Sequence, residues 1–306
     1  MNTWRKITIQ ISIPLLLLLL ASCQNAASHE VPLSAQPAIS TPTSIPTFIP
    51  TATAIASQGE MPAQATPTTP PQSTATFAPS LAPTPSPTAA IAVEKAVIEV
   101  DLSTSDGVSV KGTYYQPLGV NAPGVVLLHM LGRHREDWDA FARHLQDAGY
   151  GVIAIDLRGH GQSGGKREWS KMTQDAATAV AFIRSQTEID PDRIVIVGAS
   201  IGANIAINAG AHDPKVVGVA LLSPGLNYRG VKTEDAVIQY HDRPLFIAAS
   251  SEDRYAAESS QQLDALAQGP HQLLILENQG HGTEMLGKHN GLEAAIFQWL
   301  TEVTAP

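Results

Sequence analysis

Short, continuous apolar runs recur along the later part of this chain and alternate with longer stretches whose apolar positions follow a helical period. The runs lie at residues 125–128, 152–155, 194–197, 217–221, 245–248 and 273–276. Runs of this length without polar alternation are typical of strands buried on both faces. The helical stretches lie at 138–147, 174–185, 201–211, 258–267 and 292–303. This alternation predicts an α/β fold in which helices cover both faces of a mostly parallel sheet.

Two further strands are expected ahead of these runs. Residues 97–102 and 108–115 alternate apolar and polar positions on either side of Ser105-Asp106-Gly107, which predicts a β-hairpin. The whole sheet should then hold about eight strands. Between the sixth and seventh strands the chain has room for one short helix, at 234–240, so no large cap domain is expected.

The first residues of the chain have a different character. Arg5 and Lys6 precede a largely apolar run at 7–20, which is too short for a permanent membrane span and predicts a signal peptide over 1–22. Leu20-Ala21-Ser22-Cys23 resembles the lipobox of bacterial lipoproteins. The resemblance implies that Cys23, the only cysteine, is lipidated and anchors the mature chain to a membrane. Ordinary secretion with cleavage nearby and an unmodified thiol is the alternative.

Residues 23–93 are dominated by Pro, Thr, Ser and Ala and contain no Lys or Arg. A segment of this composition buries too little apolar surface to offset the entropy of ordering, so it predicts a disordered tether. The remaining residues, 94–306, are enough for one domain with one core. We therefore expect a domain exported to the cell surface or periplasm and held on the outer face of a bacterial membrane through Cys23.

The net charge and the spacing of the histidines indicate which kinds of partner to expect. The formal net charge is −9, and no basic cluster is present to bind phosphates, which argues against nucleic acid. The ten histidines show no metal-ligand spacing, so we expect neither a metal nor a cofactor. A small molecule is the expected partner besides the membrane, and the sequence carries no signal for an oligomeric state.

The most informative motif is Gly198-Ala199-Ser200-Ile201-Gly202, which follows the apolar run 194–197 and precedes a helical stretch. A strand, a tight turn and a helix with a serine at the apex form the setting of a nucleophile elbow. Glycines on both sides allow the sharp turn and the close approach of the helix to the strand. A serine hydroxyl is a weak nucleophile by itself, so this hypothesis requires a base, an orienting acid and donors for an oxyanion.

Residues 94–306 resemble an α/β-hydrolase. The resemblance rests on motifs that follow successive strands, namely His129-Met130-Leu131-Gly132, Asp156-Leu157-Arg158-Gly159-His160-Gly161-Gln162-Ser163, the Ser200 elbow, Asp253, and His281-Gly282. The chain order Ser, Asp, His is the one that this family uses. The resemblance implies that Ser200 is the nucleophile, His281 the general base and Asp253 the acid that orients His281.

The resemblance also implies an oxyanion hole made of backbone N–H groups. One is that of Ile201, and the other comes from the loop after His129, with Leu131 the first choice and Met130 the second. Met130 stands where the family usually has glycine, so the identity of this donor stays open. Ala203, where many relatives have another glycine, is small enough to preserve close packing.

Other residues compete for these roles. Glu252 is adjacent to Asp253 and is the alternative acid, and Asp253 itself has an alternative role as the cap of the next helix. His289, just before the last helix, and His160 are the alternative bases.

Ester hydrolysis through an acyl-enzyme is the function that this combination favours. Thioesterase, acyltransferase or peptidase activity on the same triad are alternatives within the fold, and a non-catalytic tethered binding domain is the alternative from another class. Because no cap is expected, the site should be open. Its walls are predicted to include Leu131, Trp169, Leu226, Tyr228 and Tyr255.

Overall fold

The computed structural model describes residues 95–306. The predicted signal peptide, Cys23 and the predicted tether lie outside the described residues. Among the helices of residues 95–306, none combines the length and apolar character that crossing a bilayer requires.

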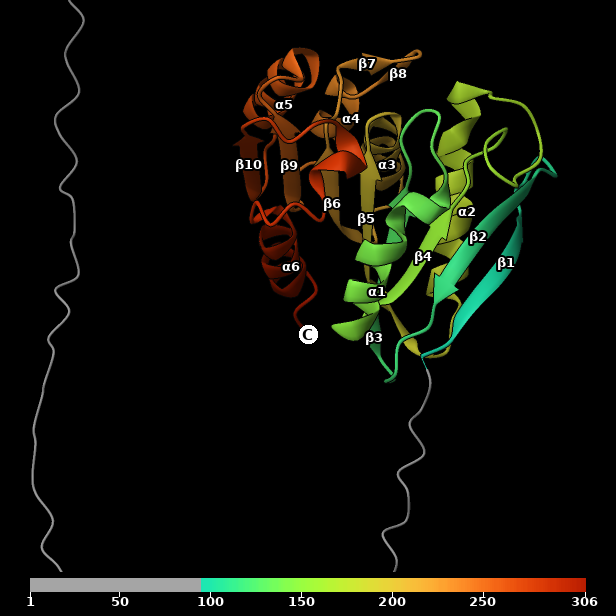
Figure 1. Cartoon of the computed structure of the whole chain (residues 1–306). Helices are drawn as coiled ribbons and strands as arrows, with labels where there is room; N and C mark the ends of the chain where they lie inside the picture. Colours follow the sequence, from blue (N-terminus) through green and yellow to red (C-terminus); the bar gives the residue numbers. More distant parts are fainter. Residues whose placement is uncertain (1–94) are drawn as a thin grey trace, which may run out of the picture. The chain divides into compact units, whose positions relative to one another are not determined.

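A single eight-stranded sheet forms the centre of the folded unit (Figure 1). Its strands are β1 (Val97–Ser103), β2 (Ser109–Tyr115), β3 (Ala122–Leu128), β4 (Gly151–Ile155), β5 (Ile189–Ala199), β6 (Val216–Leu222), β9 (Leu245–Ser250) and β10 (His271–Leu276). Their order is β1-β2-β4-β3-β5-β6-β9-β10. Only β2 pairs antiparallel, with β1 and with β4, and all other neighbours are parallel. The predicted fold class is therefore confirmed.

The apolar runs form the central strands because both faces of the sheet are covered. Every residue of β4 and β9 is buried, and so is the second half of β5, at 194–199. Helices α1 (Asp139–Asp147) and α6 (Leu292–Val303) cover one face, where Phe141, Leu145, Ile296 and Leu300 join one hydrophobic cluster. Helices α2 (Met172–Arg184), α3 (Ile201–His212), α4 (Glu234–Gln239) and α5 (Arg254–Leu266) cover the opposite face.

The connection between β6 and β9 lies above the end of the sheet at which the parallel strands finish (Figure 1). It contains the expected short helix, α4, and no cap domain. It also contains a hairpin that the sequence did not predict, made of β7 (Asn227–Tyr228) and β8 (Val231–Lys232). Strands of two residues each are too short to show a period-2 pattern.

Two element boundaries differ from the predictions for identifiable reasons. Strand β5 begins at Ile189, before the apolar run, because Ile189 pairs with Ala122 ahead of a register shift between β3 and β5. Helix α5 begins at Arg254 because the side chain of Asp253 accepts a hydrogen bond from the N–H of Ala256. Such a cap supplies a partner for an otherwise unpaired donor of the first helical turn.

Buried arginine clusters attach the β1–β2 hairpin to the rest of the sheet. The fully buried guanidinium of Arg158 binds the buried carboxylate of Asp175 and the carboxylate of Asp106 in the β1–β2 turn. Arg135 likewise forms ion pairs with the buried Asp156 and with Glu99 of β1. Both guanidinium groups have their pKa raised, because the favourable interactions with these carboxylates outweigh the cost of burial.

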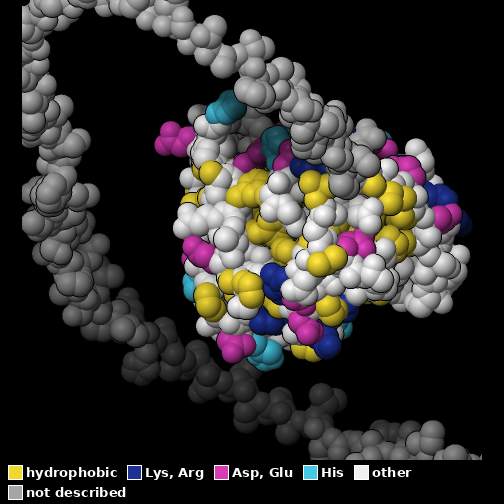
Figure 2. All heavy atoms as spheres, turned by 90° about the horizontal axis from the view of Figure 1, so that it is seen from below, with side chains coloured by type: hydrophobic (Ala, Val, Ile, Leu, Met, Phe, Trp, Pro, Cys, Tyr) yellow, Lys and Arg dark blue, Asp and Glu magenta, His cyan; other side chains and the backbone are white. Residues whose placement is uncertain are grey.

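The end of the folded unit at which the parallel strands begin is seen from below in Figure 2. Hydrophobic side chains are numerous on this face, and charged ones lie mostly toward its rim. The loop between β2 and β3 contributes two of the exposed hydrophobic side chains of the unit, Leu118 and Val120. Ser200, Asp253 and His281, the predicted catalytic residues, lie at the other end, where the strands finish.

Candidate active site

Ser200 occupies a sharp turn between β5 and α3. Its backbone has φ 55° and ψ −121°, a combination that is rare for residues other than glycine. The turn is held by a hydrogen bond of 2.8 Å from the Ser200 N–H to the carbonyl of Leu222, and by the Ala203 N–H, which donates to the Ser200 carbonyl at 2.9 Å. Strained backbone of this kind persists only where surrounding contacts enforce it.

The two glycines of the motif are required by close contacts of backbone with backbone. A β-carbon at Gly198 would overlap the carbonyl of Gly202. A β-carbon at Gly202 would overlap the carbonyl oxygens of Leu128 and His129 at the end of β3. Helix α3 can therefore start directly against β5 and β3, which leaves Ser200 at the apex of the turn.

His281 and Asp253 come together from the loops that follow β10 and β9. Nδ1 of His281 forms a hydrogen bond with Oδ2 of Asp253, while Oδ1 of Asp253 accepts from the N–H of Ala256 at 3.4 Å. Asp253 thus contacts His281 and also caps α5, so the two roles that the sequence analysis gave as alternatives occur together. The side chain of His281 is 35% exposed, whereas that of Asp253 is 20% exposed.

Glu252, the alternative acid, contacts the chain beside His281 instead of the imidazole. Its carboxylate accepts from the N–H of Gly280 at 2.6 Å and from the hydroxyl of Ser250. These hydrogen bonds lower the pKa of Glu252 to about 2. Ser250 in turn accepts from the N–H of Gln279 at 2.7 Å. Glu252 and Ser250 therefore fix the loop that leads into His281.

Ser200 and His281 line one cavity of about 440 Å³. Its lining residues are Met130, Leu131, Arg133, Ser200, Ile201, Tyr228, Arg229, His281 and Glu284. Of the predicted wall residues, Leu131 and Tyr228 belong to this lining, whereas Trp169, Leu226 and Tyr255 do not. The Tyr255 ring packs edge-on against Tyr228 at 5.5 Å, so it supports the wall from behind.

Tyr228, at the end of β7, lines the cavity together with Ser200 and His281. Its ring is edge-on to that of His281, with 6.4 Å between the centroids. Burial, followed by the nearby charge of Asp253, raises the pKa of Tyr228. The phenol therefore stays neutral and keeps its proton as a hydrogen-bond donor.

The backbone donors predicted for an oxyanion lie at the same cavity. The N–H of Ile201 is the first of α3 and has no acceptor within that helix. On the other side, within residues 95–306, the N–H groups of Met130 and Leu131 donate to no protein acceptor. The structure thus leaves the choice between these two open. The side chain of Met130 is buried, and its sulfur occupies the space beside Gly282 in which a β-carbon would stand.

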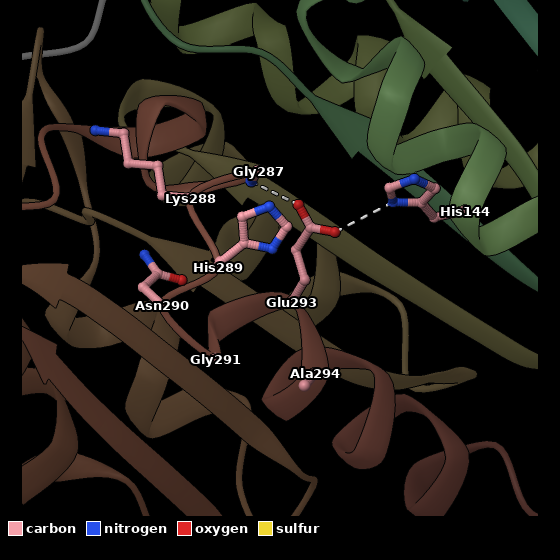
Figure 3. Close-up of a pocket in the computed structure, with 8 residues that line it drawn as sticks. All are labelled: His144, Gly287, Lys288, His289, Asn290, Gly291, Glu293 and Ala294. Carbon is pink, nitrogen blue, oxygen red and sulfur yellow. Dashed lines mark hydrogen bonds and ion pairs between the residues drawn. The ribbon is translucent and has the colours of Figure 1, made fainter.

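The other candidate histidines have different surroundings. His129 is buried, its Nε2 accepts from the N–H of Leu157 at 3.0 Å, and burial lowers its pKa to about 4. His160 is also buried, with its Nδ1 3.1 Å from the carbonyl of Arg158. His289 lines a separate cavity, together with His144 and Glu293 (Figure 3). In that cavity Nδ1 of His144 lies 3.2 Å from Oε2 of Glu293. Neither His160 nor His289 is part of the cavity that contains Ser200.

The sequence interpretation missed Arg133, Arg229, Glu284 and Ser223. Arg133 and Glu284 form an ion pair of 3.1 Å at the cavity, and the buried hydroxyl of Ser223 accepts from the N–H of Gly282 at 2.9 Å. All four residues lie within three positions of a predicted site residue, and this proximity is the only signal that the chain offered. In the described part of the chain, no group of three or more His, Cys, Asp or Glu is arranged to hold a metal.

Comparisons with known proteins support the fold. Residues 121–241 match the family described as serine aminopeptidase S33. An uncharacterized protein of Mycobacterium tuberculosis is 26% identical, over 74% of this chain and 86% of its own. The thiohydrolase aneE of Aspergillus aculeatus is 30% identical, over 51% of each chain. Among solved structures, the esterase Pf2001 of Pyrococcus furiosus superposes with a TM-score of 0.60 at 17% identity, over 69% of this chain and 92% of its own. The folded unit of this protein therefore has the α/β-hydrolase fold.

Proposed function

We propose that this protein is a serine hydrolase that cleaves carboxylic esters, with Ser200 as nucleophile, His281 as general base and Asp253 as the orienting acid. The observation that carries the proposal is the cavity that Ser200 and His281 share, with Asp253 bound to the far nitrogen of the imidazole. This bond requires a proton on Nδ1, so Nε2 is the nitrogen that is free to accept one.

The proposed reaction proceeds in two stages. Nε2 of His281 takes the proton of Ser200 as Oγ attacks the ester carbonyl, and the alcohol leaves with that proton when the tetrahedral intermediate collapses. Water then gives a proton to the same nitrogen and attacks the acyl-enzyme, which releases the acid and restores Ser200. The N–H of Ile201, together with that of Leu131 or Met130, would stabilise the oxyanion in both stages.

The site is open, because the β6–β9 connection contains only a short hairpin and one short helix. The cavity of about 440 Å³ beside Ser200 has the size of a small-molecule pocket, which supports esters of small molecules. The same triad serves thioesters and peptides, and the matching family and the thiohydrolase relative make both worth testing. Acyl transfer and a non-catalytic binding role are the remaining alternatives. The partly exposed imidazole of His281 and the strained Ser200 line one cavity, which favours an enzyme, because a binding domain gains nothing from maintaining this strain.

The decisive experiment uses the purified protein and its Ser200→Ala variant. A fluorophosphonate probe should label the native chain and not the variant, and 4-nitrophenyl esters of increasing acyl length should be hydrolysed only by the native chain. An acyl-CoA and an aminoacyl 4-nitroanilide, run beside the esters, rank the thioester and peptide alternatives. Absence of both labelling and turnover that depend on Ser200 would reject the hydrolase proposal.

We also propose that the protein is exported and anchored through a lipid on Cys23, which stands at the end of the lipobox-like segment. Two or more acyl chains on one residue give durable attachment, whereas one chain gives marginal attachment. The Cys23→Ala variant should move from the membrane fraction to the soluble fraction. Unchanged membrane retention in that variant would contradict the lipid anchor.

A further inference from the structure

The β7–β8 hairpin brings an arginine to the cavity in an unfavourable backbone conformation. Tyr228 pairs with Val231, so Arg229 and Gly230 form a two-residue turn with φ 55° and 88°. A turn with both φ values positive favours Asn or Gly at its first position, because a larger side chain is strained there. Arg229 is therefore a residue that the turn itself does not favour.

Trp169 and the cavity that contains Ser200 determine the surroundings of the Arg229 guanidinium. Arg229 lines the same cavity as Ser200 and His281, and its guanidinium lies over the ring of Trp169 at 6.0 Å from the centroid. A cation over an aromatic face is held in orientation by the ring. Trp169 is thus connected to the site through Arg229, although it does not line the cavity itself.

Arg229 differs from the other charged residues of this cavity. Arg133 is neutralised by Glu284 at 3.1 Å and lies 3.8 Å from Asp137. Arg229, in contrast, forms an ion pair with none of the carboxylates of residues 95–306. The cavity lining therefore has one positive charge in excess, on a chain whose formal net charge is −9. A local cation on an acidic protein attracts anions to that point of its surface.

We infer that Arg229 binds an anionic oxygen group of the substrate, so that the preferred esters bear a carboxylate or a phosphate beside the scissile bond. The inference rests on the proposed ester hydrolysis. A guanidinium presents planar, forked donors that match either group. The same charge would repel the ammonium group of an aminopeptidase substrate, which opposes that alternative.

The test compares matched esters on the native chain and on Arg229→Asn. One pair is the 4-nitrophenyl monoester of adipic acid and 4-nitrophenyl hexanoate, which differ by a charge on the acyl side. A second set, 4-acetoxybenzoate, 4-acetoxyphenyl phosphate and methyl 4-acetoxybenzoate, places the charge on the alcohol side and separates carboxylate from phosphate. For at least one charged ester, the ratio of its kcat/KM to that of its neutral partner should fall about fivefold in Arg229→Asn, mainly through KM.

Three controls keep the interpretation specific. Arg229→Asn should not lower the melting temperature, because Asn suits the turn. Arg229→Lys should retain part of the preference because it keeps the charge. Lys232→Gln removes one positive charge from the same hairpin at a residue that lines a different cavity, so it should leave the ratios unchanged. Equal effects of Arg229→Asn on charged and neutral esters would overturn the inference while Ser200-dependent turnover still stood.

Discussion

Two regions at the same edge of the sheet each contain an aspartate and a histidine, and they use them differently. After β4, Asp156 is fully buried and His160 is 3% exposed. After β9 and β10, Asp253 and His281 are 20% and 35% exposed and contact each other. The residue types are the same, so the difference lies in what surrounds them.

In the first region, the carboxylate of Asp156 is occupied by structural partners. It accepts from the N–H groups of Arg135 and Gln162, both at 2.9 Å, and pairs with the guanidinium of Arg135. Gly161 must lack a side chain because a β-carbon there would overlap this carboxylate. In the second region, His281 keeps one edge of its ring at a cavity. An Asp–His combination becomes chemically useful only when such an edge is left accessible.

The strongest test of this difference is to remove each histidine in turn. His281→Gln should lower kcat for a 4-nitrophenyl ester by about 10⁴-fold, because no base remains for Ser200. His160→Gln should change kcat by less than about fivefold, while lowering the free energy of unfolding by about 1–3 kcal/mol through a lost buried hydrogen bond. Urea denaturation measures the second effect. A large loss of kcat in a stably folded His160→Gln would show that the first region also takes part in the reaction.

Removing the carboxylates of Asp253 and Glu252 in turn tests which of them orients His281. Asp253→Asn should lower kcat by about 10³-fold or more, because an amide cannot stabilise the imidazolium form of His281. Glu252→Gln should lower kcat by less than about tenfold, since Glu252 only holds the loop at Gly280 in place. Both substitutions preserve side-chain shape. If the two losses in steady-state kinetics were reversed, Glu252 would be the orienting acid.

The sequence predicted the fold well because buried strands and amphipathic helices leave long periodic patterns. It also placed Ser200, Asp253 and His281 on the strand-end loops that the structure brings together, since the position of each motif after a strand determines which edge of the sheet it reaches. It did not predict Arg229, because the two-residue strands of its hairpin leave no periodic signal. It did not predict Ser223 either, because its contact with Gly282 joins residues far apart in sequence.

The buried arginines give a third prediction, about stability instead of turnover. Arg158→Met should lower the free energy of unfolding by about 3–5 kcal/mol, because it leaves the buried charge of Asp175 without a counter-ion and with only the backbone N–H of residue 158 as a donor. Adding Asp175→Leu should restore part of that loss, since it removes the unpaired charge. Urea denaturation of the single and double variants measures both effects. A double variant no more stable than Arg158→Met would mean that Asp175 is not the source of the penalty.

The last prediction concerns how the stability of the buried region responds to acid. In the folded state burial lowers the pKa of His129 to about 4, from an ordinary value of 6.5. Between these pH values the unfolded chain binds the extra proton and the folded chain does not, so stability should fall as the pH drops from about 6.5 to about 4. This histidine should contribute about 3 kcal/mol to the fall.

Burial also lowers the pKa of His160. His129→Gln should therefore weaken the dependence of stability on pH without abolishing it. The exposed His212 offers a matched control, because His212→Gln should leave the slope unchanged. Urea midpoints measured across this pH range give the slope directly. An unchanged slope in His129→Gln would mean that folding does not lower the pKa of His129, so that the folded chain binds this proton within the same pH range as the unfolded chain. In that case its protonated Nε2 could not accept from the N–H of Leu157, and the contact between the loops after β3 and β4 would need a different explanation.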